Sequence, residues 1–309
     1  MFNRREMLAA TAAAASTYGL GSFPAGWADD KTGKRRKVLM YTRSEGYQHA
    51  SVSRDKAEYG PAELVLMDLG QKHGFDVYAT KDGSVFTPEN IAKYDAFFFY
   101  TQGDLSKAQS RDESPPVSAE GKAAFLQAIK DGKGFVATHS ASDTYHSPEH
   151  YGKNQFVNQP NRDPYIEMIG GEFIKHGPQQ VAKMVIADPK FPGLEDRSKS
   201  FEMHDEWYSL KNFADDLHVV LIQETAGMKG SDYDRPNFPA TWARKHGKGR
   251  VFYSSMGHRA DVWTNPIFQN LILGALSWAT GNVNADITPN LRQVTPEFAT
   301  MPPAPKKKK

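Results

Sequence analysis

The sequence changes from apolar to polar within one short stretch, Gly134-Phe135-Val136-Ala137-Thr138-His139-Ser140-Ala141-Ser142-Asp143-Thr144. Its first half predicts a buried strand, because a short apolar run follows the turn signal at residues 131–134. Its second half places His139 and Ser140 directly after that strand. Open α/β sheets bind ligands at the loops that leave the carboxyl ends of their strands, so this loop is a predicted site. The alternative is a capped turn, in which Ser140, Ser142 or Asp143 begins the next helix.

Strand and helix patterns alternate on both sides of this stretch. Apolar runs predict strands over residues 38–41, 75–79, 96–100, 181–188, 217–224, 239–244 and 250–254. Amphipathic patterns and caps predict helices over residues 61–73, from Ser118 onward, and over 265–280. This alternation predicts an α/β fold, a doubly wound, mostly parallel, flavodoxin-like sheet with helices on both faces.

Composition narrows the possible chemistry. The chain has 309 residues, of which 39% are hydrophobic and none is cysteine. Without cysteine there are no disulfides, thiolate metal ligands or thiol catalysis. The formal net charge is +2, but the lysine run at 306–309 accounts for more than this, so the body is mildly acidic. The body carries no basic stripe, and we expect no nucleic-acid partner.

The first 28 residues have the pattern of an export signal. The segment Asn3-Arg4-Arg5-Glu6-Met7-Leu8 resembles a twin-arginine motif and precedes an Ala-rich apolar run. Small residues at Gly26 and Ala28 predict cleavage after Ala28, and therefore a periplasmic or extracytoplasmic protein. The apolar run is too short to span a bilayer, so no stable membrane insertion is expected.

The remaining segments differ in composition. Residues 29–36 form a charged linker, and residues 37–283 carry the alternating patterns of one expected domain. Residues 284–309 are rich in proline and lysine without a helical or strand period, which predicts a flexible C-terminal tail. The oligomeric state is not indicated by any of these patterns.

Five histidines lie near predicted strand ends or in polar motifs, namely His49, His139, His176, His204 and His258. Imidazole binds divalent metals and transfers protons near neutral pH. Two or three of them meeting with Asp205 or Glu206 would form a zinc-like site with an open position. The alternative is a set of hydrogen-bonded histidines that hold loops. His146 and His150 are expected in a surface loop, because the residues between them predict a helix start.

Several segments together resemble the ThuA-like (trehalose utilisation) family, whose fold is a variant of the class I glutamine amidotransferase fold. They are Gly46-Tyr47-Gln48-His49, residues 134–144, Tyr151-Gly152, Gly170-Gly171-Glu172-Phe173 with His176, Asp205-Glu206-Trp207-Tyr208, and residues 247–253 through Gly257-His258 to Trp278-Ala279. The resemblance covers residues 37–283. It implies a small-molecule carbohydrate partner, such as trehalose, another disaccharide or a 3-keto derivative.

The resemblance also excludes one activity. In amidotransferases a cysteine occupies the sharp turn after the strand, where this chain has His139, so glutaminase chemistry is not expected. A serine hydrolase built on Ser140 is an alternative, although the glycines of the Gly-x-Ser-x-Gly elbow are missing.

Roles follow from the residue types and the motifs. Asp205 and Glu206 face opposite ways if they lie on a strand, so one of them can enter the crevice. The expected catalytic residues are His139, Asp205 and Glu206, and the expected metal ligands are His139, His176 and His258. The expected substrate-binding residues are Tyr47, His49, Ser140, Asp143, Trp207 and Tyr208, and Tyr145 and Trp263 are further aromatic rings suited to stacking on sugars. We expect an enzyme, with a non-catalytic sugar-binding protein as the alternative.

Overall fold

The computed structural model describes residues 34–304 apart from 196 and 198. A nine-stranded mixed sheet runs in the order β2-β1-β3-β4-β11-β10-β9-β6-β7. Its strands are β1 (Arg36–Tyr41), β2 (Phe75–Thr80), β3 (Ala96–Phe99), β4 (Gly134–Thr138), β6 (Gln180–Ile186), β7 (Ser200–Asp205), β9 (His218–Gln223), β10 (Phe238–His246) and β11 (Gly249–Ser254). A separate antiparallel pair consists of β5 (Glu172–His176) and β8 (Tyr208–Lys211).

The five strands from β2 to β11 pair in parallel, as the alternating pattern predicts. Every residue of β3 and β4 is buried, because helices cover both faces of this half of the sheet. Successive side chains point to opposite faces, so Phe98 joins one hydrophobic core and its neighbours Phe97 and Phe99 join the other. The predicted α/β class is therefore confirmed.

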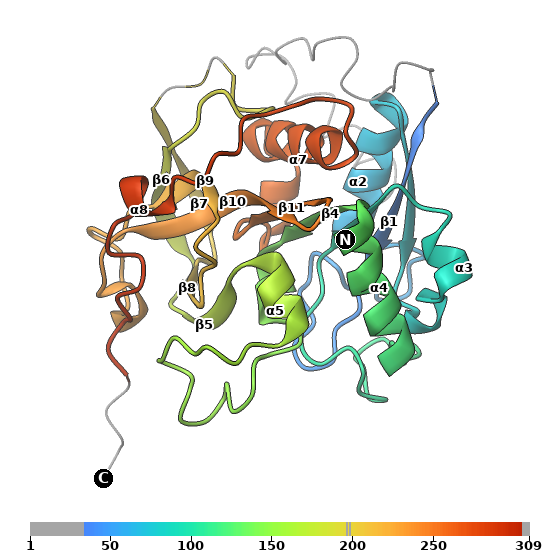
Figure 1. Ribbon diagram of the computed structural model, residues 1–309, viewed down its shortest axis with the longest axis horizontal. Coiled ribbons are helices and arrows are strands. Elements are labelled where there is room, and N and C mark those ends of the chain that lie inside the picture. The colour runs from blue at the N-terminus through green and yellow to red at the C-terminus, as the bar shows by residue number, and fades with distance from the viewer. Residues whose placement is uncertain (1–33, 196, 198, 305–309) are drawn as a thin grey trace.

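Helices form a layer on each face of the sheet (Figure 1). The core on one face includes α2 (Pro61–Lys72), α6 (Ala260–Trp263) and α7 (Pro266–Ala279). The core on the other includes α3 (Pro88–Ile91), α4 (Ala119–Asp131) and α5 (Pro164–Ile169), together with β5 and β8. The short helices are η1 (Gly83–Val85), η2 (His139–Asp143), η3 (Ser231–Tyr233) and α8 (Leu291–Val294). In the described part of the chain, no helix has both the length and the apolar character needed to cross a bilayer.

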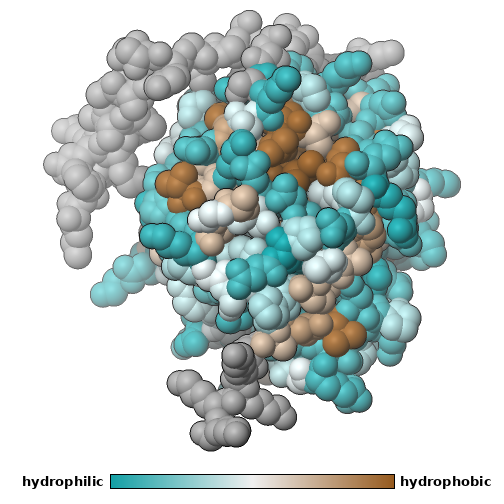
Figure 2. All heavy atoms as spheres, turned by 90° about the vertical axis from the view of Figure 1, so that its left-hand side faces the viewer, coloured by the Kyte–Doolittle hydropathy of each residue, from teal (hydrophilic) through white to brown (hydrophobic). Residues whose placement is uncertain are grey.

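Beyond β11 the sheet becomes antiparallel and ends at β7. This edge strand exposes Glu202 and His204, and polar side chains on an edge discourage pairing with other chains. On the face of the molecule that Figure 2 shows, which is the left-hand side of Figure 1, hydrophilic residues surround smaller apolar patches. His204, one of the five candidate histidines, therefore lies exposed on the edge strand.

The expected flexible tail is residues 284–309, and its described part, residues 284–304, packs against the domain. Leu291 and Phe298 are buried in the core that contains α4. The Asn290 side chain accepts from the Val219 N–H of β9, and Arg235 donates to the Phe298 carbonyl. Isolated apolar residues without a period gave no sign of this packing in the sequence. The predicted signal at 1–28 lies outside the described residues.

Candidate functional site

The candidate site lies at the carboxyl ends of two neighbouring parallel strands, β4 and β11. β4 and β11 pair in register up to Thr138 and Ser254, so the loops that follow them leave the same edge side by side. The next residue, His139, has a φ of 45°, a left-handed backbone conformation that is strained for a residue other than glycine. Its Nδ1 lies 3.0 Å from the Ser255 carbonyl oxygen. In the tautomer that carries its hydrogen on Nδ1, the ring donates to that oxygen, and its Nε2 faces His258 Nδ1 at 3.2 Å.

Three histidine rings converge on the carboxylate of Glu206, which directly follows β7. Oε2 lies 3.1 Å from His258 Nδ1 and 3.6 Å from His139 Nε2, and Oε1 lies 3.4 Å from His176 Nδ1. Burial alone would raise the pKa of Glu206, but the His139 and His258 rings outweigh it and hold this pKa well below its usual value. Glu206 is therefore a carboxylate at neutral pH.

His49, from the loop after β1, completes the group. Its ring centroid lies 4.8 Å from that of His139 and 5.0 Å from that of His258. Burial lowers the pKa of His49 well below its usual value, and the neighbouring imidazoles add to this effect. The ring is thus neutral, and its buried Nδ1 has no hydrogen-bond partner in the described structure. We call His49, His139, His258 and Glu206 the histidine cluster.

The histidine cluster has the donor set of a divalent metal site. One ligand atom from each of the four side chains lies within 4.8 Å of every other. Metal-binding histidines commonly donate their other N–H to a backbone carbonyl, as His139 does to Ser255. His258 Nε2 lies 2.9 Å from the Gln179 amide nitrogen, so ligation through Nδ1 requires the other tautomer and a turned amide. His176 lies at the margin, with 44% of its side chain exposed.

Asp205 and Glu206 make different contacts, although both contact the segment that carries His258. Asp205 is fully buried and accepts the backbone N–H groups of Gly257 at 2.7 Å and Arg259 at 3.1 Å. Burial raises the pKa of Asp205, while the His139 ring and these backbone donors oppose the rise. The carboxylate therefore holds the backbone on both sides of His258 and so positions that ring.

Among the aromatic candidates, Tyr47 and Tyr208 lie beside the cluster. Tyr47 is 59% exposed, with its ring centroid 4.9 Å from that of His49. Tyr208 is buried, with its ring centroid 4.1 Å from that of His139. The expected stacking residues Tyr145, Trp207 and Trp263 are buried in the hydrophobic cores, so their rings are not presented to a sugar.

The polar residues after β4 have other surroundings than expected. A 3₁₀ turn, η2, follows β4, and the next α-helix, α5, begins only at Pro164 with Asp163 as its cap. Ser140 is buried, and its hydroxyl has no hydrogen-bond partner among the described residues, so no general base contacts it. Asp143 accepts from Gln102 and Tyr151 instead of facing the histidine cluster.

Sequence reasoning missed several members of this region. Gln179 contacts both His258 and Arg259, and no pattern in its segment indicates this. His146 and His150 were expected in a surface loop, yet the His150 side chain is buried and both rings face Glu172. The signal available was the motif Gly170-Gly171-Glu172, which places a carboxylate at the start of a strand.

A surface hollow lies at the opposite edge of the sheet. Arg36, Asp95 and Lys133, which stand at or before the starts of strands, are among its lining residues. The convergence of titratable side chains, rather than the size of a hollow, therefore marks the candidate site.

Comparisons with known structures agree with this fold. A ThuA-like protein from Bacteroides uniformis ATCC 8492 superposes with a TM-score of 0.60 at 21% identity, over 84% of this chain and 95% of that one. A ThuA-like protein from Parabacteroides merdae ATCC 43184 gives a TM-score of 0.55 at 16% identity, over 87% and 97% of the two chains. The chain has no significant match among curated protein sequences.

The fold class is thus an α/β sheet shared with ThuA-like proteins. Residues 37–279 match the ThuA family, which is described as trehalose utilisation. The chain belongs to the ThuA family, and this membership supports a carbohydrate-related role.

The contacts of Asp205 lead to a stability prediction. Replacing Asp205 by alanine leaves two buried N–H groups without an acceptor, so the free energy of unfolding should fall by about 1–3 kcal/mol. Asp205→Asn, which keeps one oxygen, should lose less. Asp215→Ala is the matched control, because its ion pair with Arg292 is exposed and should contribute less than about 1 kcal/mol. Urea unfolding curves in which Asp205→Ala is as stable as Asp215→Ala would contradict the anchoring role.

Proposed function

We propose that this chain is a carbohydrate-modifying enzyme whose site is the histidine cluster, holding a divalent metal ion such as zinc. Its substrate class is a disaccharide such as trehalose, or a keto derivative of one. The observation that carries the proposal is the meeting of three imidazoles and a carboxylate from four separate loops, with all ligand atoms within 4.8 Å. Burying such groups is costly unless each has a partner, and a metal ion would provide one.

The donor set supports a metal more than a purely hydrogen-bonded arrangement. His49 Nδ1 is buried without a partner, and a missing hydrogen bond of this kind costs about 1–3 kcal/mol. Neutral imidazole nitrogens and a carboxylate oxygen are the ligands of catalytic zinc sites, which keep one position open. A bound divalent ion would polarise a sugar carbonyl or hydroxyl oxygen.

The other residues would bind the substrate and move protons. Tyr47 offers an exposed ring beside the cluster, suited to the apolar face of a sugar. His176 is partly exposed and contacts Glu206, so it can exchange a proton with a substrate hydroxyl at the margin of the site. The absence of cysteine excludes a glutamine amidotransferase.

A non-catalytic sugar-binding protein is the second candidate, since the same crevice could hold a sugar without reaction. Binding sites of that kind rely on amides and aromatic rings, whereas this site concentrates imidazoles and a carboxylate. The two candidates differ in turnover, which can be measured directly.

The enzyme proposal predicts metal-dependent turnover. Purified protein should convert at least one member of a panel of disaccharides and their 3-keto derivatives when Zn²⁺, Mn²⁺ or Co²⁺ is supplied, as followed by product chromatography. Glu206→Gln should lower the rate by about 100-fold or more, because it removes the carboxylate at the centre of the cluster. Glu224→Gln, at a partly exposed ion pair with Lys183, should leave the rate unchanged. Sugar binding without turnover would favour the second candidate.

We also propose export through the twin-arginine route, on the basis of Arg4 and Arg5 before the apolar run. Replacing both arginines by lysine should leave the uncleaved precursor in the cytoplasm, which cell fractionation can detect. Export at the original level after this change would contradict the assignment.

A further inference from the structure

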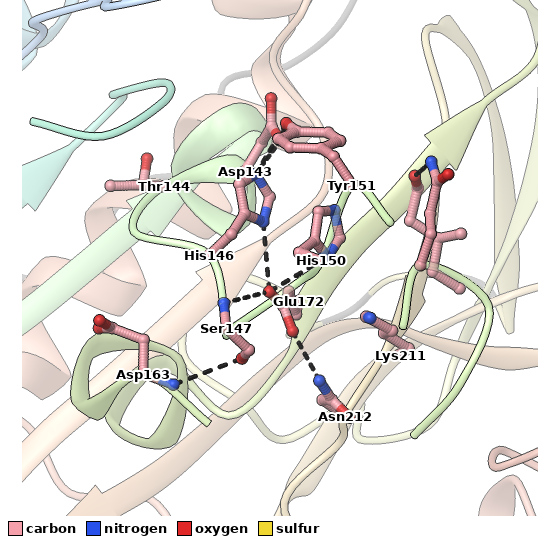
Figure 3. A network of polar contacts seen from close by, with 12 residues as sticks. Asp143, Thr144, His146, Ser147, His150, Tyr151, Asp163, Glu172, Lys211 and Asn212 are labelled. Carbon is pink, nitrogen blue, oxygen red and sulfur yellow. Dashed lines mark hydrogen bonds and ion pairs between the residues drawn. The ribbon is translucent and has the colours of Figure 1, made fainter. Parts of the chain in front are cut away.

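A second group of metal-ligating side chains lies beyond η2, in surroundings unlike those of the histidine cluster. His146 and His150 come from the segment after η2, and Glu172 is the first residue of β5. The side chains of His150 and Glu172 have no exposed surface, and that of His146 is 10% exposed. We call these three residues the second cluster, and they face one another in Figure 3.

The donor atoms of the second cluster are close and convergent. Glu172 Oε1 lies 3.2 Å from His146 Nδ1 and 3.3 Å from His150 Nδ1. The two imidazole rings stack with centroids 3.8 Å apart. One ligand atom from each of the three side chains lies within 4.8 Å of the others. Two imidazoles and one carboxylate with an open position form a ligand set known from zinc sites.

A second layer of hydrogen bonds orients these donors. Asp143 Oδ1 lies 2.6 Å from His146 Nε2, which gives the carboxylate–histidine arrangement typical of metal ligands. Asn212 donates to Glu172 Oε2 at 2.6 Å and so fixes the carboxylate, leaving Oε1 toward the histidines. The Lys211 amine donates to the Asn154 carbonyl and to the Gln159 side chain and not to Glu172.

His150 provides the independent sign of a missing ligand. Both of its ring nitrogens are buried and have no hydrogen-bond partner among the described residues. Glu172 Oε1, its nearest acceptor, already receives the Ser147 N–H at 2.8 Å. His150 Nδ1 thus has only the 3.3 Å contact with Glu172, and Nε2 has no partner in the described structure; a metal ion bound to the ring would offset the cost of burying it.

We propose that His146, His150 and Glu172 bind a second divalent metal ion of the zinc type. Tyr151 is 63% exposed, and its ring lies against both imidazoles, so the ion reaches the cluster from the surface beside it. Such an ion would join the segment after η2 to β5.

Hydrogen bonds connect this site to the histidine cluster. Asp143, the partner of His146, accepts from the Gln102 amide at 2.9 Å. The Gln102 oxygen in turn accepts the N–H groups of Gly46 and Tyr47, in the loop that carries His49. An ion in the second cluster therefore holds Asp143 in place and, through it, this loop.

Metal binding by the full chain tests the proposal. Protein freed of metal with a chelator is titrated with Zn²⁺ alone, and bound zinc is measured by calorimetry and by elemental analysis. The wild type should bind two equivalents if both clusters are sites. Glu172→Gln and His150→Gln should each lose one equivalent or raise its Kd by about 100-fold or more. His246→Gln, at the last residue of β10, is the matched control and should retain both.

The outcomes separate the two sites. Loss of an equivalent in Glu172→Gln but not in Glu206→Gln would support the second cluster even if the histidine cluster bound no metal. If a ligand variant fails to fold, Asn212→Ala should still raise the Kd by about 10-fold, because it removes the bond that orients Glu172, and the bond from the Gln159 N–H, while keeping all three ligands. Unchanged zinc stoichiometry and affinity in all three variants would overturn the proposal. The second cluster would then be a hydrogen-bonded histidine pair, with His146 held as a cation between Asp143 and Glu172.

Discussion

The parallel pairing of β4 with β11 is the constraint on which the candidate site depends. The paired residues of the two strands end at Thr138 and Ser254, so the residues that follow both strands leave the sheet side by side at one edge. The Ser255 carbonyl then accepts from His139 and turns its Nε2 toward Glu206. A shift of one residue in this register would move His139 to the other face of the sheet, and the group of side chains around Glu206 would no longer form.

The site concentrates groups that are expensive to bury. Asp205 and Glu206 have different roles: Asp205 holds the loop around His258, and Glu206 faces the imidazoles. His139 adds backbone strain at a φ of 45°, and His49 adds a buried nitrogen without a partner. Proteins retain such costs mainly at functional sites, where a ligand or a reaction uses them.

Sequence patterns were sufficient for the fold but only for part of the site. Continuous apolar runs predict strands covered on both faces, and the meeting of His139 with His258 follows from their positions after two such strands. The sequence predicts His49 as a substrate-binding residue. Its contact with the His139 and His258 rings could not be predicted, because spacing alone does not show how the loop after β1 folds back on them. Glu172 reaches His146 only through tertiary packing, and Leu291 is an isolated apolar residue whose burial no period predicts.

The proposed role of the histidine cluster as a metal centre can be tested on the molecule itself. The most direct measurement is a crystal structure of the full chain soaked in Co²⁺, with anomalous scattering recorded at the cobalt edge. A metal centre should give an anomalous peak at about 2.0–2.2 Å from ligand atoms of at least three of His49, His139, His258 and Glu206. If no peak appears at the histidine cluster, and His49, His139 and His258 remain grouped around Glu206 as a hydrogen-bonded set, the cluster is not a metal centre.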